Sequence, residues 1–385
     1  MLSERRQKCL NELLKTDWDG VLYASGASFQ YLSECTGYFW QRNCFNLGAP
    51  VANAHIFPEA LIYMNREGKT TILCIPRYKD YFMNHDVVIS YMDQFEDELS
   101  RIIDGKKIGI GRDCESWMMT TLKEVNPEIE CVSAETLFDE IRKIKDQAEI
   151  EHLAKLAKFT DDAIMHVVTN LKEGMTQYQV EHMIMEYGFT HGIQDFSFPP
   201  TAGFKTRKTF KSPEENFIFD RETKLVPGTA IAFDVGYMDQ GYCSDWGRTV
   251  YYGKAPEFVK KGYFALQECQ TYMISKIVPY ETKVGDLYGF ICEKARELGY
   301  YDCLRFKQGS GAGNGHQIGI EVHEVPWLKE DCEEVLKPGM VFCSEPKMMF
   351  PEECYTRVED MILVTETGAV SLTTFPRDLF EIDGK

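Results

Sequence analysis

The stretch TAIAFDVGYMDQGYCSDWGRTVYYG (229–253) decides the fold, because it predicts a β-hairpin with one aspartate in each arm. Apolar and aromatic residues flank a polar centre at Asp239 and Gln240. A two-residue turn there would set Asp234 opposite Asp245, with Cβ atoms about 5 Å apart. Like charges that face each other repel, so the pattern predicts a cation between the two arms.

A second stretch, GMVFCSEPKMMFPEECYTRVEDMILVTETG (339–368), repeats this arrangement. A turn centred on Glu352 would set Glu345 opposite Glu359, unless a bulge shifts the register. A carboxylate in a strand usually faces solvent, but the apolar neighbours of Asp234 and Glu359 indicate burial. Four buried carboxylates without four nearby cations predict divalent metal.

The stretch GNGHQIGIEVHEVP (313–326) supplies two histidines. His316 would add a nitrogen ligand, and five ligands, four of them carboxylates, suit two divalent ions. Oxygen-rich ligation with one imidazole favours Mn, Fe, Co or Zn over copper. The alternatives are a hydrogen-bonded structural role for His316 and a rim position without a catalytic part for His323. A straight strand would place the two rings on opposite faces, so Gly319 is expected to break it.

Composition limits the classes of function. The chain has 385 residues, 60 acidic against 42 basic, and a net charge of −18, which argues against a nucleic-acid binder. No run of 18 apolar residues occurs, so no membrane span is expected. The 13 cysteines form no CxxC pair, and we interpret them as reduced thiols of a cytoplasmic protein.

The length and the texture of the chain predict two domains. Strand and helix patterns alternate over residues 1–140, which predicts an α/β domain with strands at 20–25, 59–76, 107–113 and 129–134 and a helix at 116–125. Residues 133–172 have a mainly helical pattern, and helices are also expected at 176–192, 256–277 and 284–298. Around the two hairpins, these helices predict an α+β domain over residues 141–385.

At this point the chain resembles a known family. The order Asp, Asp, His, Glu, Glu within FDVG…YCSDWGRT, GHQIGIEVHE, SEP and RVED resembles the pita-bread metallohydrolases, the group of prolidase, aminopeptidase P and methionine aminopeptidase, with creatinase as a metal-free relative. The resemblance implies a creatinase-type amino-terminal α/β domain and an α+β pita-bread catalytic domain. It also implies a cytoplasmic homodimer that acts on a small peptide or another small molecule.

The resemblance implies a role for each matching residue. Asp234, Asp245, His316, Glu345 and Glu359 match the ligands of two metal ions, and Asp245 and Glu359 match the bridging positions. Glu345 also matches the general base that acts with a metal-bridged hydroxide. His323 matches a histidine that stabilises the tetrahedral intermediate. Arg357 matches an arginine beside the last ligand, and we expect it to bind the substrate.

The sequence also departs from the family pattern. No histidine follows FSFPPTAGF (196–204), where peptidases of this branch carry one. Lys205, Arg207 and Lys208 stand there instead, and we expect them to bind an anionic group of the substrate, unless they form a solvated basic loop. Gln317 and Lys347 replace family glycines, and Ala312 replaces a histidine.

Two enzymatic functions follow from the intact ligand set and the altered pocket. The first is an Xaa-Pro aminopeptidase or dipeptidase of the prolidase type. The alternative is a non-peptidase enzyme on the same scaffold, either a C–N hydrolase similar to creatinase or ectoine hydrolase, or an enzyme similar to the sulfoniopropionate lyases. A binding protein that lost the chemistry is a third class, against which the complete ligand set argues.

Overall fold

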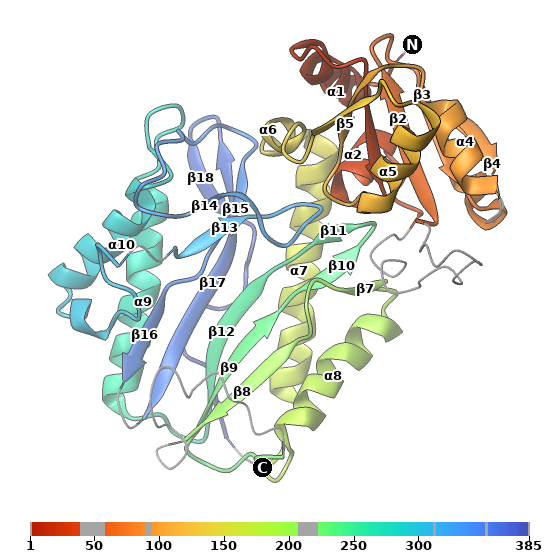
Figure 1. The fold of residues 1–385 in the computed structure, drawn as a ribbon. Coiled ribbons are helices and arrows are strands. Elements are labelled where there is room, and N and C mark those ends of the chain that lie inside the picture. The colour runs from red at the N-terminus through yellow and green to blue at the C-terminus, as the bar shows by residue number, and fades with distance from the viewer. Residues whose placement is uncertain are drawn as a thin grey trace. The chain divides into compact units, whose positions relative to one another are not determined.

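The structure is a computed structural model that describes residues 2–38, 58–89, 94–206, 222–310, 313–350 and 353–383. Contacts within the chain divide it into two compact units, Met1–Arg142 and Lys143–Lys385. The units have separate β-sheets (Figure 1). Their hydrophobic clusters are separate as well.

The first unit has the predicted α/β character. Its strands lie in the order β4-β3-β2-β1-β5-β6, with parallel and antiparallel pairs mixed. The expected strands and the helix at 116–125 are confirmed. The elements are α1 (Glu4–Leu14), β1 (Gly20–Ala24), α2 (Ala27–Ser33), β2 (Ala60–Asn65), β3 (Thr70–Cys74), η1 (Pro76–Phe82), β4 (Asp86–Ile89), α4 (Phe95–Ile102), β5 (Lys107–Ile110), α5 (Ser116–Val125), β6 (Glu130–Ser133) and α6 (Asp139–Arg142).

The second unit has two pairs of long helices at the predicted places. They are α7 (Gln147–Thr169), α8 (Gln177–Thr190), α9 (Glu257–Ser275) and α10 (Asp286–Glu297), with a short 3₁₀ turn, η4 (Tyr301–Cys303). Capping boxes at Asp146 and Thr176 begin α7 and α8, because each side chain accepts a hydrogen bond from the third helical N–H. Within the described residues, the helices lack the combination of length and apolar character that crossing a bilayer requires.

The second unit contains a ten-stranded sheet with the main order β14-β13-β15-β17-β12-β9-β8, as far as the described residues define it. A small sheet, β11-β10-β7, accompanies it. The strands are β7 (Asp195–Phe196), β8 (Thr201–Lys205), β9 (Thr229–Val235), β10 (Tyr237–Asp239), β11 (Tyr242–Cys243), β12 (Trp246–Tyr252), β13 (Gly315–Gln317), β14 (Glu324–Trp327), β15 (Val341–Ser344), β16 (Lys347–Phe350), β17 (Cys354–Thr365), β18 (Gly368–Ser371) and β19 (Glu381–Ile382).

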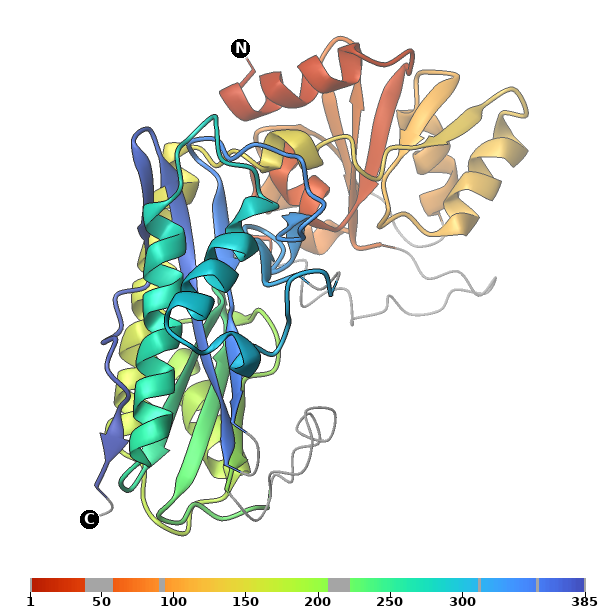
Figure 2. The ribbon, with the colours of Figure 1, turned by 90° about the vertical axis from the view of Figure 1, so that its left-hand side faces the viewer.

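The helices of this unit lie on one face of the large sheet (Figures 1 and 2). Side chains alternate between the faces along each strand, so Phe233 of β9 and Val250 of β12 pack against α7 and α8 in one cluster. Val358 and Ile362 of β17 pack in a second cluster with α9 and α10. The residues between these apolar positions therefore point to the opposite face of the sheet, where the candidate site lies.

One predicted hairpin register is wrong. The turn between Asp234 and Asp245 joins β10 to β11 at Gln240 and Gly241, one residue later than expected, with φ of 49° and 75°. Two positive φ values define the turn type that matches the twist of a two-residue hairpin. The shift moves the register by two residues, so Gly247 rather than Asp245 lies opposite Asp234.

The second predicted register is confirmed. β16 and β17 pair Lys347 with Arg357, and β15 and β17 pair Ser344 with Asp360. Both pairs belong to the register that sets Glu345 opposite Glu359. Two of the three expected turn residues, 351 and 352, lie outside the described residues.

The left-handed φ of Gln240 predicts a stabilising substitution. Replacing Gln240 with Asn, which adopts this region with less strain, should raise the free energy of unfolding by about 0.5–1 kcal/mol. Thermal unfolding followed by circular dichroism measures the effect. Asp239→Asn serves as the control, since this position has an ordinary φ, and an equal gain in both variants would contradict the explanation.

Candidate metal centre

The five predicted ligands lie on five neighbouring elements of the second unit. Asp234 is the next-to-last residue of β9, and Asp245 directly precedes β12. His316 is the central residue of β13, Glu345 directly follows β15, and Glu359 lies within β17. Adjacent strands β13, β15, β17, β12 and β9 thus bring residues from distant parts of the sequence to one face of the sheet.

Gly247 separates two of these carboxylates. It pairs with Asp234 on one side and with Glu359 on the other, so the three residues form a row across the sheet. A Cβ atom at position 247 would lie 2.5 Å from Arg357 Nε and 2.9 Å from Glu359 Oε2. The position therefore requires glycine for space, because any side chain would fill the region between the acids.

Part of the centre is compact enough to hold an ion. One ligand atom each from Asp245, His316, Cys343 and Glu359 lies within 4.8 Å of the others, and all four residues are buried. Asp245 Oδ1 and Glu359 Oε1 are buried without a hydrogen-bond partner in the described structure. An unpaired buried carboxylate oxygen is costly, and a divalent cation removes that cost. The residues therefore fit a metal ion.

The orientation of His316 also suits a metal ligand. Its Nδ1 lies 3.0 Å from the carbonyl oxygen of Gln317, which can only accept, so Nδ1 carries the proton. Its Nε2 faces the acids, 3.4 Å from Asp245 Oδ2. Burial lowers the pKa of the His316 imidazole, but the Asp245 carboxylate outweighs burial and raises that pKa above its usual value. The ring is thus held with Nε2 toward the carboxylates, which is the orientation a metal ligand needs.

Arg357 is the cation that joins the acids. Its guanidinium pairs with Asp234 and Glu359, and its Nη2 lies 3.3 Å from Glu345 Oε2. Burial, together with the other carboxylates, raises the pKa of Glu359 well above its usual value although Arg357 opposes this. Burial likewise raises the pKa of Asp234. One arginine therefore does not balance the negative charge of this cluster.

Glu345 has a different electrostatic environment. Burial alone would raise its pKa, but the ammonium of Lys347 and the guanidinium of Arg357 outweigh burial and lower that pKa to about 2. Lys347 forms an ion pair with Glu345 Oε2. Glu345 is therefore ionised at neutral pH and already has two cationic partners.

His323 reaches the centre because its strand stops. β13 ends at Gln317, and the following loop turns back, so the His323 and His316 rings lie 4.4 Å apart between centroids. His323 also stacks on Trp327 at 5.2 Å. The loop is fixed by Cys243, whose N–H donates to the Gly319 carbonyl over 2.8 Å. The expected strand break thus lies at the position where the chain needs to reverse.

A buried ion pair holds the same loop from the other side. Glu324 Oε1 accepts hydrogen bonds from the N–H groups of Ile320 at 3.1 Å and Glu321 at 3.4 Å. Its Oε2 lies 2.9 Å from Lys145 Nζ, and Lys145 also donates to Gln317 Oε1 at 3.4 Å. The lysine and glutamate side chains are 1% and 6% exposed, so neither charge is solvated. The pair positions the segment between His316 and His323.

Loss of this lysine should destabilise the second unit. In Lys145→Met the Glu324 carboxylate stays buried without its ammonium partner, which should lower the free energy of unfolding by about 3–5 kcal/mol. Urea unfolding measures the difference. Lys155→Met, at an exposed position of α7, should cost little. If the double variant Lys145→Met/Glu324→Gln were as unstable as the single one, the explanation by an unpaired charge would be wrong.

The basic residues predicted to bind substrate lie apart from the ligands. Lys205 is the last residue of β8 and pairs with Ala230, whereas Asp234 pairs with Thr201 at the other end of that strand. Four residues of strand correspond to roughly 13 Å. Lys205 is buried, and burial lowers the pKa of its ammonium. Arg207 and Lys208 lie outside the described residues.

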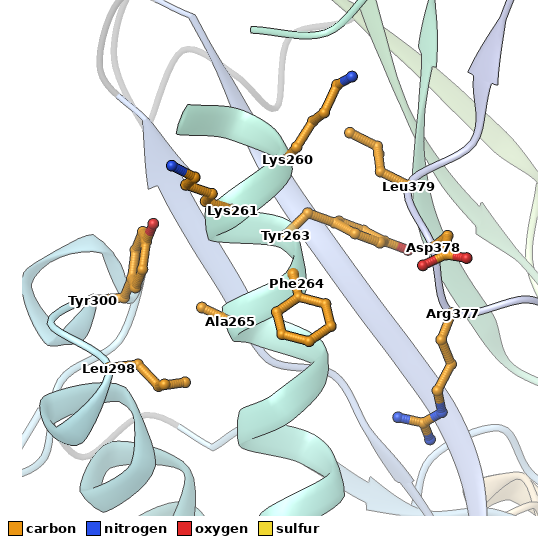
Figure 3. A pocket seen from close by; sticks show the side chains of 10 residues that line it. All are labelled: Lys260, Lys261, Tyr263, Phe264, Ala265, Leu298, Tyr300, Arg377, Asp378 and Leu379. Carbon is orange, nitrogen blue, oxygen red and sulfur yellow. The ribbon is translucent and has the colours of Figure 1, made fainter. Parts of the chain in front are cut away.

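A separate cavity of about 510 Å³ opens beside α9 (Figure 3). It shares no residue with the carboxylate cluster. Its lining consists of Lys260, Lys261, Tyr263, Phe264, Ala265, Leu298, Tyr300, Arg377, Asp378 and Leu379.

The sequence reasoning did not include three residues of the centre. Cys343 lies in the compact group, and Lys145 and Glu324 hold its loop. A signal for Cys343 was present, because it precedes Glu345 by two residues and alternation puts both on one face of the sheet. The pairing of Lys145 with Glu324 left no local signal, since 179 residues separate the two.

The fold and the cluster define a metallohydrolase. The chain belongs to metallopeptidase family M24, whose family model matches residues 151–366. A putative dipeptidase of Bacillus subtilis, YkvY, is 32% identical over 261 residues, which cover 67% of this chain and 68% of the relative. An Xaa-Pro dipeptidase of Pyrococcus horikoshii is 24% identical over 382 residues, 98% of this chain and 99% of that protein.

Solved structures agree on the fold. The crystal structure of a dipeptidase from Pyrococcus horikoshii superposes with a TM-score of 0.82 at 22% identity and covers 98% of this chain and 100% of that one. A variant of Escherichia coli aminopeptidase P superposes with a TM-score of 0.75 at 16% identity, over 98% and 97%. The predicted architecture, an amino-terminal α/β domain followed by a pita-bread catalytic domain, is confirmed.

Proposed function

We propose that this metallopeptidase is an Xaa-Pro dipeptidase or aminopeptidase that cleaves short peptides with two divalent ions. The observation that carries the proposal is the pair of unpartnered, buried carboxylate oxygens, Asp245 Oδ1 and Glu359 Oε1, in one compact group with a ring nitrogen of His316. The name of the Pyrococcus horikoshii relative, an Xaa-Pro dipeptidase that the chain matches over nearly its whole length, supports this substrate class.

The proposed ligands are Asp234, Asp245, His316, Glu345 and Glu359. Hard carboxylate oxygens with one imidazole suit Mn, Co, Zn or Fe. When bound, such ions polarise a carbonyl and lower the pKa of water.

The other roles fall to side chains of this chain. Glu345 is assigned as the general base by the family resemblance, and as an ionised carboxylate it could accept a proton from water. Its contacts with Lys347 and Arg357 weaken it as a base, so displacement of Lys347 would strengthen this role. His323 lies beside His316, on the loop that Cys243 and Glu324 hold in place. It would donate a hydrogen bond to the oxygen of the scissile carbonyl as negative charge develops there. Arg357 keeps the acids at their mutual distances through its three carboxylate contacts.

Lys205, with Arg207 and Lys208, is proposed to bind an anionic group of the substrate. Alternation along paired strands supports this for Lys205, because Lys205, Thr201 and Asp234 point to the same face of the sheet. A carboxylate at the far end of a short peptide would then lie away from the ions, along β8.

The non-peptidase alternatives are not favoured. The relatives of known name are dipeptidases and peptidases, rather than C–N hydrolases of the creatinase type or sulfoniopropionate lyases. The remaining expectations stay proposals: a cytoplasmic homodimer with domains at 1–140 and 141–385 that binds neither nucleic acid nor membrane. The net charge of −18 supports the absence of a nucleic-acid partner.

The function is tested by metal-dependent cleavage. The purified full chain, stripped of metal and then supplied with Mn²⁺ or Co²⁺, should hydrolyse Xaa-Pro dipeptides, measured by release of proline. Asp245→Asn should weaken metal binding by about 100-fold or more, because a direct ligand contributes more than a supporting residue. Equilibrium dialysis with elemental analysis measures the bound metal.

Glu366→Gln, at an exposed position just after β17, is the matched control and should leave both metal content and cleavage unchanged. Full metal content in Asp245→Asn would exclude the proposed centre. Metal binding without any cleavage of peptides would instead exclude the peptidase and return the choice to the alternatives.

Substrate binding by the basic residues is tested separately. Lys205→Met keeps the buried stem and removes the charge, and it should raise KM for a dipeptide about tenfold with kcat nearly unchanged. Lys224→Met, an exposed lysine of the same unit, should change neither constant. An unchanged KM in Lys205→Met would remove this residue from the substrate site.

A further inference from the structure

Lys347 places a second positive charge beside the guanidinium of Arg357. It is the first residue of β16 and the direct cross-strand partner of Arg357. Like charges that face each other across two strands repel. Both side chains are largely buried, at 12% and 8% exposed, so water does not screen this repulsion. The arrangement is stable because both cations share the carboxylate of Glu345.

The compact group of ligand atoms includes only two of the four carboxylates, those of Asp245 and Glu359. Asp245, His316, Cys343 and Glu359 hold the four atoms within 4.8 Å of one another and the two unpartnered oxygens. Asp234 and Glu345 are outside that group, and their carboxylates pair with Arg357 and Lys347. Arg357 also pairs with Glu359 inside the compact group, whereas the ion pair of Lys347 with Glu345 lies outside it.

The charges disfavour a second ion as long as Lys347 stays in place. The four carboxylates, when ionised, carry a charge of −4. Arg357, Lys347 and one divalent ion together supply +4, so that combination is neutral. A second divalent ion would leave an excess of +2 in a buried site, and ions of like sign a few ångströms apart repel strongly at low dielectric.

We propose that Lys347 is a built-in cation that competes with the second divalent ion for Glu345. The chain then holds one ion tightly at Asp245, His316 and Glu359 and binds a second only when Lys347 is displaced. This inference rests on the proposed metallopeptidase function and adds to it a residue that sets the number of ions. Occupancy of the second position is governed by metal concentration, because the ion must displace the ammonium.

The test counts ions in the full-length chain. Metal-free protein is titrated with Mn²⁺ and with Co²⁺ by isothermal calorimetry, and the Co²⁺ absorption spectrum reports the ligand environment independently of activity. The wild-type chain should bind one ion, with the second at least about tenfold weaker, which is about 1.4 kcal/mol. Lys347→Met should tighten the second ion about tenfold and leave the first unchanged.

Two further variants separate charge from shape. Lys347→Arg keeps the charge and should behave as the wild type does, whereas Lys347→Gly should behave as Lys347→Met does. Lys337→Met removes an exposed lysine of the same unit and should change neither ion. Circular dichroism checks that each variant is folded, and the wild-type count tests the proposal even if a variant is not.

Two equally tight ions in the wild type, or a second ion in Lys347→Met as weak as in the wild type, would overturn this inference. In either case cleavage of Xaa-Pro dipeptides would leave the proposed function standing. A wild-type chain that bound no ion and cleaved no peptide would overturn both proposals.

Discussion

Mutual repulsion among buried and half-buried carboxylates is the constraint on which this molecule depends. Asp234 and Glu359 lie on either side of Gly247, and Asp245 lies next to the same central strand. The rest of the second unit keeps these groups together. Glycine leaves the space between them, Arg357 supplies one compensating charge, and the helices cover the opposite face of the sheet. Side chains alternate between the two faces of a strand, so Phe233 and Val358 point into the cores while the neighbouring Asp234 and Glu359 point toward the site.

Arg248 and Asp360 are a second set of buried charges, on the face of the sheet that the helices cover. They form an ion pair in which both side chains are 1% exposed, on the strands that also carry Gly247 and Glu359. Arg248 Nη1 donates to the backbone carbonyls of Glu359 at 2.7 Å and Gly247 at 2.8 Å. The backbone beneath the site is therefore fixed by hydrogen bonds that ordinary ladder pairing does not supply. Charged groups on both faces of β12 and β17 hold the row of site residues in one register.

Sequence patterns were sufficient for the elements and for most of the candidate site. The places of the helices followed from apolar periodicity, although the pattern over 133–172 did not show that α7 begins only after Asp146. The register of β15 and β16 on β17 followed from symmetry about the turn. The polar centre at Asp239 and Gln240 predicts the turn one residue too early, because Gly241 is the residue that tolerates a positive φ. Asp234 and Asp245 nevertheless meet, through the residues before β12 rather than through direct pairing. The contact of Lys145 with Glu324 depends on tertiary packing and has no counterpart in local sequence.

The second unit has two hydrophobic cores, one under β8, β9 and β12 and the other under β15 to β17. Asp234 lies in β9 and Asp245 directly before β12, over the first core. Glu359 lies in β17 and Glu345 directly after β15, over the second core, with His316 on the neighbouring β13. An ion bound by both sets is therefore a cross-link between two separately packed halves. Because a ligand stabilises the state that binds it in proportion to its free concentration, the lifetime of the folded chain would follow the supply of metal in its surroundings. Starvation for that metal would then reduce how much of the protein persists as well as how fast it works.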